Sequence, residues 1–209
     1  MVHGMAISVA SFFVRKQYIS DKLYDWCVYA VERRIQKALV FIAILLIGAF
    51  THTVGESLIF YVGFILFRKR MGGYHASSPA KCFIISVLLI QAGVKFLQPI
   101  LEPYAYIWGS CFGIVVIAVV LLVRPANHPN MHMTPEEVQA NWARARVTLV
   151  PLTALLTAGL FWAPSAHWAF SGLISVTMAA FMLAFAKCIG QEVKENGRQK
   201  DPEPDGQGG

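Results

Sequence analysis

Long apolar runs separated by short polar turns dominate the chain from residue 38 to residue 187. Such runs are typical of helices that lie in a bilayer. The first two fall short of the roughly 20 residues that a spanning helix needs, so we expect them to tilt, to recruit flanking polar residues, or to form a hairpin that does not cross fully. The pattern predicts an all-α integral membrane protein with about six hydrophobic helical segments, at residues 38–51, 57–67, 82–101, 104–123, 147–163 and 168–187.

The two ends of the chain have different patterns. In residues 1–37, aromatic and aliphatic side chains alternate with lysine and arginine, which is typical of amphipathic helices lying in the membrane interface. The first apolar run, AISVASFFV, is short and lacks a basic leader, so these residues are expected to stay attached. Residues 191–209 are polar and rich in glycine and proline, and they are expected to form a disordered cytoplasmic tail. Residues 38–190 would then form the membrane-embedded domain.

Composition supports a membrane protein and narrows its partners. Of the 209 residues, 56% are hydrophobic and only 14% are charged, and the mean hydropathy is +0.53. A soluble domain of this length would need more polar surface. The formal net charge of +6 is scattered between the apolar segments and forms no separate basic domain. The charge therefore indicates contact with the lipid bilayer, and no nucleic-acid partner is expected.

Lysine and arginine predict how the segments are oriented. They gather in residues 15–37, 68–81, 124–146 and 187–200, whereas the turns THTVGES, EPYA and APSAH contain neither residue. Because basic residues concentrate on the cytoplasmic side of a membrane protein, this distribution places both chain ends and the 68–81 loop in the cytoplasm. We expect a multi-pass cell-membrane protein.

The loop RKRMGGYHASSPAKC, residues 68–82, carries candidate chemistry. Ser78 and Pro79 predict a helix start, with Ser78 as N-cap and Pro79 as the first helical residue. Cys82 then falls in the first turn, where the positive helix end and the nearby cations favour a reactive thiolate. A cytoplasmic thiol stays reduced. The four cysteines show no CxxC pairing and indicate neither a disulfide framework nor a zinc site.

His75 lies seven residues before Cys82, and the intervening serine-rich bend offers a way to fold the imidazole toward the sulfur. Gly72 and Gly73 give the backbone the freedom to approach a substrate closely. A cysteine nucleophile paired with a histidine base is the catalytic pair of a thiol protease. Spacing alone leaves the alternatives open: Cys82 as an inert apolar residue, and His75 as a loop side chain that touches lipid phosphate.

This loop resembles the accessory gene regulator protein B (AgrB) family, bacterial membrane cysteine endopeptidases that process quorum-sensing propeptides. The matching residues are Arg68, Gly73-Tyr74-His75-Ala76, the serine-rich bend and Cys82. Weaker similarity occurs at residues 29–32, where an alanine replaces the family's glycine, and at residues 124–130. The resemblance spans about residues 20–190.

The resemblance implies roles for individual residues. They are Cys82 as nucleophile, His75 as base, Gly73 for loop shape, and Arg68 and Glu32 as supporting residues. A carboxylate near the membrane surface needs a cation, so Arg68 and Arg70 are candidate partners of Glu32. Alternatively, Glu32 orients protonated His75.

The resemblance also implies a reaction and its partners. The substrate would be a small AgrD-like propeptide whose C-terminal tail is cleaved, leaving an acyl-enzyme thioester. A cysteine or serine within the peptide would then close a thiolactone or lactone ring. No cofactor is expected, and a homodimer is expected from the family alone.

Other interpretations predict different outcomes. A peptidase without cyclisation would release a linear product, and a non-catalytic scaffold would not need its thiol. A small transporter would place polar residues at the middle of several segments, and segments three to six contain few. Residues 128–136 hold two histidines and a glutamate at helical spacing, but interrupting prolines favour a loop, so no metal site is expected. His167 is interpreted as an interfacial anchor.

Overall fold

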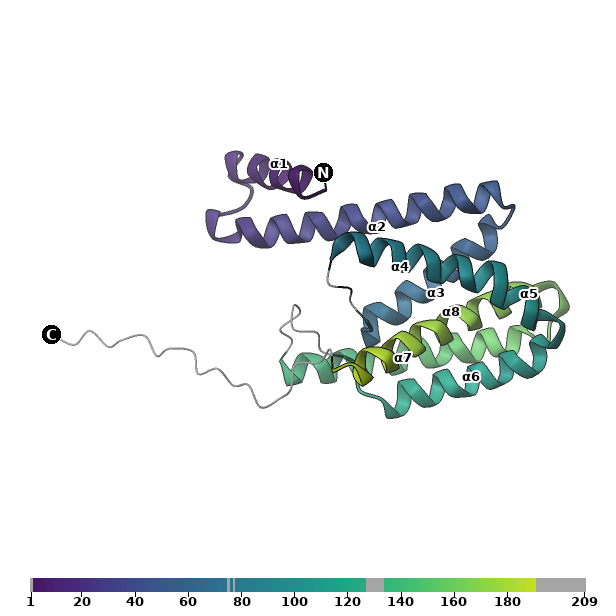
Figure 1. Cartoon of the computed structure of the whole chain (residues 1–209). Helices are drawn as coiled ribbons and strands as arrows, with labels where there is room; N and C mark the ends of the chain where they lie inside the picture. Colours follow the sequence, from purple (N-terminus) through teal and green to yellow (C-terminus); the bar gives the residue numbers. More distant parts are fainter. Residues whose placement is uncertain (1, 75, 77, 127–133, 191–209) are drawn as a thin grey trace.

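The computed structural model describes residues 2–74, 76, 78–126 and 134–190. The predicted base His75, most of the 128–136 histidine stretch and the 191–209 tail lie outside the described residues. Within them the chain is helical, joined by short connections (Figure 1). The elements are α1 (Val2–Arg15), η1 (Asp21–Leu23), α2 (Tyr24–Phe50), α3 (Val54–Met71), α4 (Pro79–Ala92), the π-helical turn η2 (Gly93–Leu97), α5 (Gln98–Leu101), η3 (Glu102–Tyr104), α6 (Ala105–Leu122), α7 (Pro135–Gly159) and α8 (Ala163–Cys188).

The all-α fold class is confirmed, while the number of spanning helices differs from the expected six. In the described part of the chain, two helical stretches, Ala80–Leu122 and Ser165–Cys188, are long and apolar enough to cross a membrane. One reason is that the third and fourth predicted segments form one continuous helical stretch, because the turn between them is itself a 3-10 helix. The other predicted segments lie in α2, α3 and α7, whose charged ends lower the apolar character of each helix.

The N-terminal helices join the bundle without a break at residue 37. Figure 1 shows α1 lying along the first half of α2, away from the other helices. Ala6 and Ala10 of α1 pack there against Cys27 and Val28 of α2. Helix α2 then continues to Phe50, so the amphipathic stretch and the first apolar segment belong to one helix.

Helix α8 forms the centre of the bundle and contacts α3, α6 and α7. Phe60 and Phe67 of α3 and Phe170 of α8 are fully buried in the main hydrophobic core. Gly63 of α3 lies directly against Ser175 of α8, where a β-carbon would come within 2.1 Å of the serine Oγ. Small residues at this contact let the two backbones approach closely, as is common between helices in membranes.

A polar cluster joins three elements at the end of the bundle where α3 and α8 begin. His167 of α8 contacts Glu56 of α3 through Nε2 at 3.0 Å and Glu102 of η3 through Nδ1. Beside it, Ser171 donates a hydrogen bond to Gln98 at 2.8 Å. His167 therefore connects three parts of the bundle. Its ring also contacts that of Trp168, a neighbour that suits the predicted interfacial anchor.

Candidate active site

The start of α4 fixes the position of Cys82. Ser78 has an extended backbone, and its Oγ accepts a hydrogen bond from the Lys81 N–H at 3.3 Å. Pro79 follows as the first helical residue, which confirms the predicted helix start. The Cys82 N–H donates to the Ser78 carbonyl at 3.0 Å. Cys82 therefore lies in the first turn of α4, on a backbone held by its own cap.

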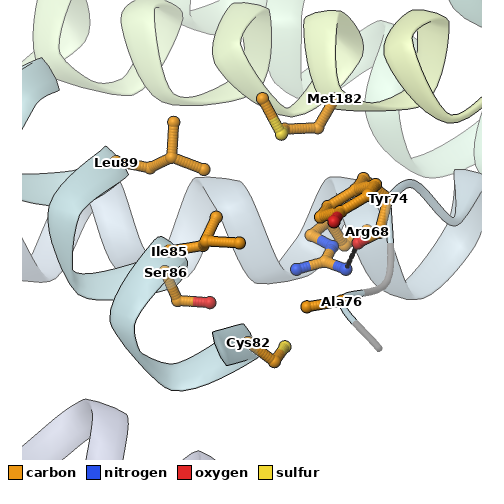
Figure 2. Close-up of a pocket in the computed structure, with 8 residues that line it drawn as sticks. All are labelled: Arg68, Tyr74, Ala76, Cys82, Ile85, Ser86, Leu89 and Met182. Carbon is orange, nitrogen blue, oxygen red and sulfur yellow. Dashed lines mark hydrogen bonds between the residues drawn. The ribbon is translucent and has the colours of Figure 1, made fainter. Parts of the chain in front are cut away.

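Cys82 opens onto a small pocket between α3, α4 and α8 (Figure 2). Four lining residues come from α4 at helical spacing, so that they share one face of that helix. The pocket has a volume of about 10 Å³, which is room for about one water-sized group. Its lining residues are Arg68, Tyr74, Ala76, Cys82, Ile85, Ser86, Leu89 and Met182.

Arg68, in the last turn of α3, brings a cation to this pocket. Its Nη2 donates to the Tyr74 carbonyl at 2.5 Å, and its guanidinium lies 5.5 Å from the centre of the Phe64 ring. Burial lowers the pKa of Arg68, and the neighbouring Cys82 opposes that shift. An arginine remains charged even when its pKa is lowered, so the sulfur has a fixed cationic partner.

The connection from α3 toward α4 is held against α8. Gly72 ends α3 with a φ of +76°, and its N–H donates to the Arg68 carbonyl at 2.9 Å. Gly73 follows with a φ of +146°, a backbone conformation that residues with a side chain rarely adopt. The Tyr74 N–H then donates to the Met182 carbonyl at 3.2 Å. This conformation favours glycine at position 73, and the bond of Tyr74 holds the loop against α8.

The structure brings together Arg68, Gly73 and Cys82 of the predicted site residues. Gly73 is buried beside Arg68, where an added β-carbon would lie 3.6 Å from the arginine Nε. Tyr74 and Ala76, the sequence neighbours of the undescribed His75, both line the pocket.

Glu32 and Arg70 lie outside the residues that line the pocket. Glu32, on α2, forms an ion pair with His3 of α1 at 2.9 Å between Oε1 and Nδ1. Among the described ion pairs, Glu32 therefore pairs with His3 and not with the expected Arg68 or Arg70. Arg70 lies partly buried in the last turn of α3.

Ser86 and Met182 line the pocket but were not singled out from the sequence. Ser86 follows Cys82 by four residues, a spacing that places both on one helix face and was available as a signal. Met182 comes from α8, and no local pattern connects that helix to the 68–82 loop. In the described part of the chain, no group of three or more histidine, cysteine, aspartate or glutamate residues could hold a metal ion.

Comparison with known protein families identifies the family of this chain. The family model for accessory gene regulator B matches residues 6–183, a range that includes Glu32, the whole 68–82 loop and Met182. No curated protein and no solved structure gives a significant match.

Proposed function

Because the chain belongs to the accessory gene regulator B family, we propose that it is a membrane cysteine endopeptidase that removes the C-terminal tail of a small propeptide and cyclises the remainder. The family is associated with processing of the AgrD propeptide in quorum sensing, and it is a membrane-associated family. The cleavage chemistry, the nucleophile and the ring closure are the parts proposed for this chain.

The observation that carries the proposal is the pocket shared by Cys82 and Arg68. The thiolate is the nucleophilic form of cysteine, and a neighbouring cation stabilises it. Arg68 is held in place by the Tyr74 carbonyl and by the Phe64 ring, so its charge stays beside the sulfur.

The first step is an acyl transfer from the propeptide to Cys82. His75 takes the thiol proton, and the sulfur attacks the carbonyl carbon of the scissile bond, forming a C–S bond. The tetrahedral intermediate collapses as the C–N bond breaks. The departing amine of the tail takes the proton back from the His75 imidazolium, and the N-terminal part of the propeptide remains on Cys82 as a thioester.

The second step closes the ring. A thiol or hydroxyl within the bound peptide attacks the thioester carbon, its proton passes to His75, and the bond to Cys82 breaks. The product is a thiolactone or lactone, and Cys82 is regenerated without an external energy source. Ring closure competes with hydrolysis, so a site that excludes water from the thioester favours the cyclic product.

The proposal extends to the orientation of the chain. Cys82 begins α4, directly after the basic end of α3, which carries Arg68, Lys69 and Arg70. Positively charged connections favour the cytoplasmic side, so the site would face the cytoplasm and meet a propeptide before export. The apolar segments of α2, α3 and α7 would cross or enter the bilayer together with the two long apolar stretches.

The test is co-expression of the chain with a matched propeptide in bacterial membranes, followed by mass spectrometry of the products. Wild type should release the tail and a cyclic peptide lighter by one water than the hydrolysed fragment. Cys82→Ala should release neither. Cys111→Ala, which removes an exposed thiol of α6, is the matched control and should behave as wild type.

Two results would change the account. A product with the mass of the hydrolysed fragment would indicate a peptidase without cyclisation. Cleavage by Cys82→Ala at the rate of wild type would exclude Cys82 as the nucleophile.

A further inference from the structure

The backbone donors beside Cys82 are already used. Attack on a carbonyl converts its oxygen into an oxyanion, which needs donors at about 2.7–3.1 Å. The N–H groups of Cys82 and Lys81 both bond to Ser78, at 3.0 and 3.3 Å, and Pro79 has none. Ala80, the remaining residue of this turn, is exposed and lies outside the pocket lining. The first turn of α4 therefore leaves no backbone donor for the pocket, and side chains that line the pocket are a further source of donors.

Ser86 presents a hydroxyl to the same pocket. Hydroxyls within helices often bond back to the carbonyl four residues earlier. In this chain Thr148, Thr157 and Ser171 do so, at 2.7, 2.9 and 3.2 Å. Within the described part of the chain, the Ser86 hydroxyl makes no such bond and lies on the face of α4 that carries Cys82.

Arg68 supplies a second donor on the opposite wall. A guanidinium has five N–H groups, and its bond to the Tyr74 carbonyl uses only part of them. Figure 2 shows the Ser86 oxygen, the Arg68 nitrogens and the Cys82 sulfur directed toward one space. The volume of that pocket, about 10 Å³, accommodates about one oxygen-sized group, with the rest of a peptide outside it.

We propose that the Ser86 hydroxyl is a further catalytic group, which together with Arg68 holds the carbonyl oxygen of the scissile bond when that oxygen becomes negative. This inference rests on the proposed function of Cys82 as nucleophile. It assigns the pocket as an oxyanion site for a peptide acyl group.

The same oxyanion forms in both steps of the reaction. When sulfur bonds to the carbonyl carbon, the C=O π pair moves to oxygen, and Ser86 and Arg68 donate hydrogen bonds without giving up their protons. Collapse restores the C=O bond and expels the amine, which takes its proton from His75. When the peptide's own nucleophile attacks the thioester, the negative oxygen returns, and its collapse breaks the C–S bond. Loss of Ser86 therefore slows both cleavage and ring closure.

The experiment compares Ser86→Ala, Ser86→Thr and wild type in single-turnover cleavage of a matched propeptide, with membranes in excess. Removing one oxyanion donor lowers the rate by about 10²- to 10³-fold, so Ser86→Ala should lose about that factor. Ser86→Thr keeps a hydroxyl and should recover most of the rate. Ser8→Ala, which removes an exposed hydroxyl from α1, is the matched control and should cleave as wild type.

A second measurement separates the oxyanion role from damage to the nucleophile. Iodoacetamide alkylates a thiolate by displacement at a saturated carbon, so no oxyanion forms. Alkylation of Cys82 should therefore proceed in Ser86→Ala as in wild type. If Ser86→Ala loses alkylation together with cleavage, its role is structural and the inference is overturned.

The two proposals fail in different ways. If Ser86→Ala cleaves as fast as wild type while Cys82→Ala is inactive, the oxyanion role of Ser86 is wrong and Cys82 remains the nucleophile. If Cys82→Ala itself cleaves at the wild-type rate, both proposals are overturned.

Discussion

At the scale of single residues, Arg68 connects the parts of the site. It donates to the Tyr74 carbonyl, lies over the Phe64 ring, and shares the pocket with Cys82. Gly73 makes this arrangement possible because its φ of +146° turns the chain from the end of α3 toward α8. The site thus depends on one backbone conformation as well as on side-chain chemistry.

Substituting Gly73 tests that dependence. Gly73→Ala must hold a positive φ, which costs about 1–3 kcal/mol when the conformation is retained. We expect a lower midpoint of thermal unfolding in detergent and a loss of propeptide cleavage. The matched control is Gly4→Ala, because a β-carbon at this helical glycine of α1 meets nothing within 4 Å. An unchanged cleavage rate in Gly73→Ala would show that the loop conformation is dispensable.

Short-range features of the site were predictable, and long-range ones were not. The Ser78–Pro79 start of α4 follows from local chemistry, since an N-cap and a first-turn proline act within a few residues. The ion pair of Glu32 with His3 depends on how α1 folds back on α2, which no periodicity encodes. Ser86 is partly predictable from the sequence. Its spacing to Cys82 places both on one helix face, but the pocket that they line also includes Arg68 of α3, which that spacing does not reveal.

At the scale of elements, the His167 cluster holds together α3, η3 and α8. Glu56 and Glu102 both face the imidazole of His167, one at each ring nitrogen. Lys95 of η2 adds a hydrogen bond to the end of α2, because its Nζ donates to the Thr51 carbonyl at 3.0 Å. The charged and polar residues of this end therefore serve packing between helices.

Removing the imidazole should destabilise the bundle and spare the chemistry. His167→Ala leaves two carboxylates without their shared partner, and hydrogen bonds to charged groups contribute about 1.5–3 kcal/mol. Exposure of 40% of the His167 side chain places the expected loss at the low end of that range. The unfolding midpoint in detergent should fall.

The cleavage rate of His167→Ala should not follow its loss of stability. Glu56 and Arg68 are twelve residues apart on α3, which is about 18 Å at 1.5 Å per residue, so the cluster lies far from Cys82. The cleavage rate of folded His167→Ala should therefore stay close to that of wild type. A specific loss of cleavage, with the unfolding midpoint unchanged, would contradict a structural role for this cluster.

The sequence predicted which segments are helical more accurately than it predicted where the helices begin and end. Each predicted apolar segment falls wholly or largely within a helical stretch, because apolar runs of this kind have few other stable forms in a membrane. Helix α2 continues through residue 37, since a helix can pass from a charged stretch into an apolar one without changing its backbone. Helix α7 likewise begins at Pro135, where Thr134 and Glu137 form a capping box, well before its apolar part.

At the scale of the whole molecule, the two ends of the bundle differ in chemistry. One end carries Cys82, its pocket and the basic last turn of α3. The other carries the His167 cluster and the turn at η3. This asymmetry supports the proposed orientation, with the Cys82 end in the cytoplasm.

Labelling with a membrane-impermeant maleimide tests this orientation. In a variant without its four natural cysteines, Tyr104→Cys places a thiol in the exposed turn η3, and Lys69→Cys places one at the exposed end of α3. Tyr104→Cys should be labelled in intact cells, and Lys69→Cys only after the cells are opened. Labelling of Lys69→Cys in intact cells would place the Cys82 end outside.

The most direct test of the central claim is to trap the acyl-enzyme on Cys82. The chain is incubated with a propeptide whose internal ring-forming cysteine or serine is replaced by alanine, and its intact mass is then measured. Acyl transfer to Cys82 predicts a mass increase equal to the hydrolysed N-terminal fragment less one water, located on Cys82, removed by hydroxylamine and absent from Cys82→Ala. Release of the propeptide tail by Cys82→Ala at the wild-type rate, with no adduct on either protein, would contradict it.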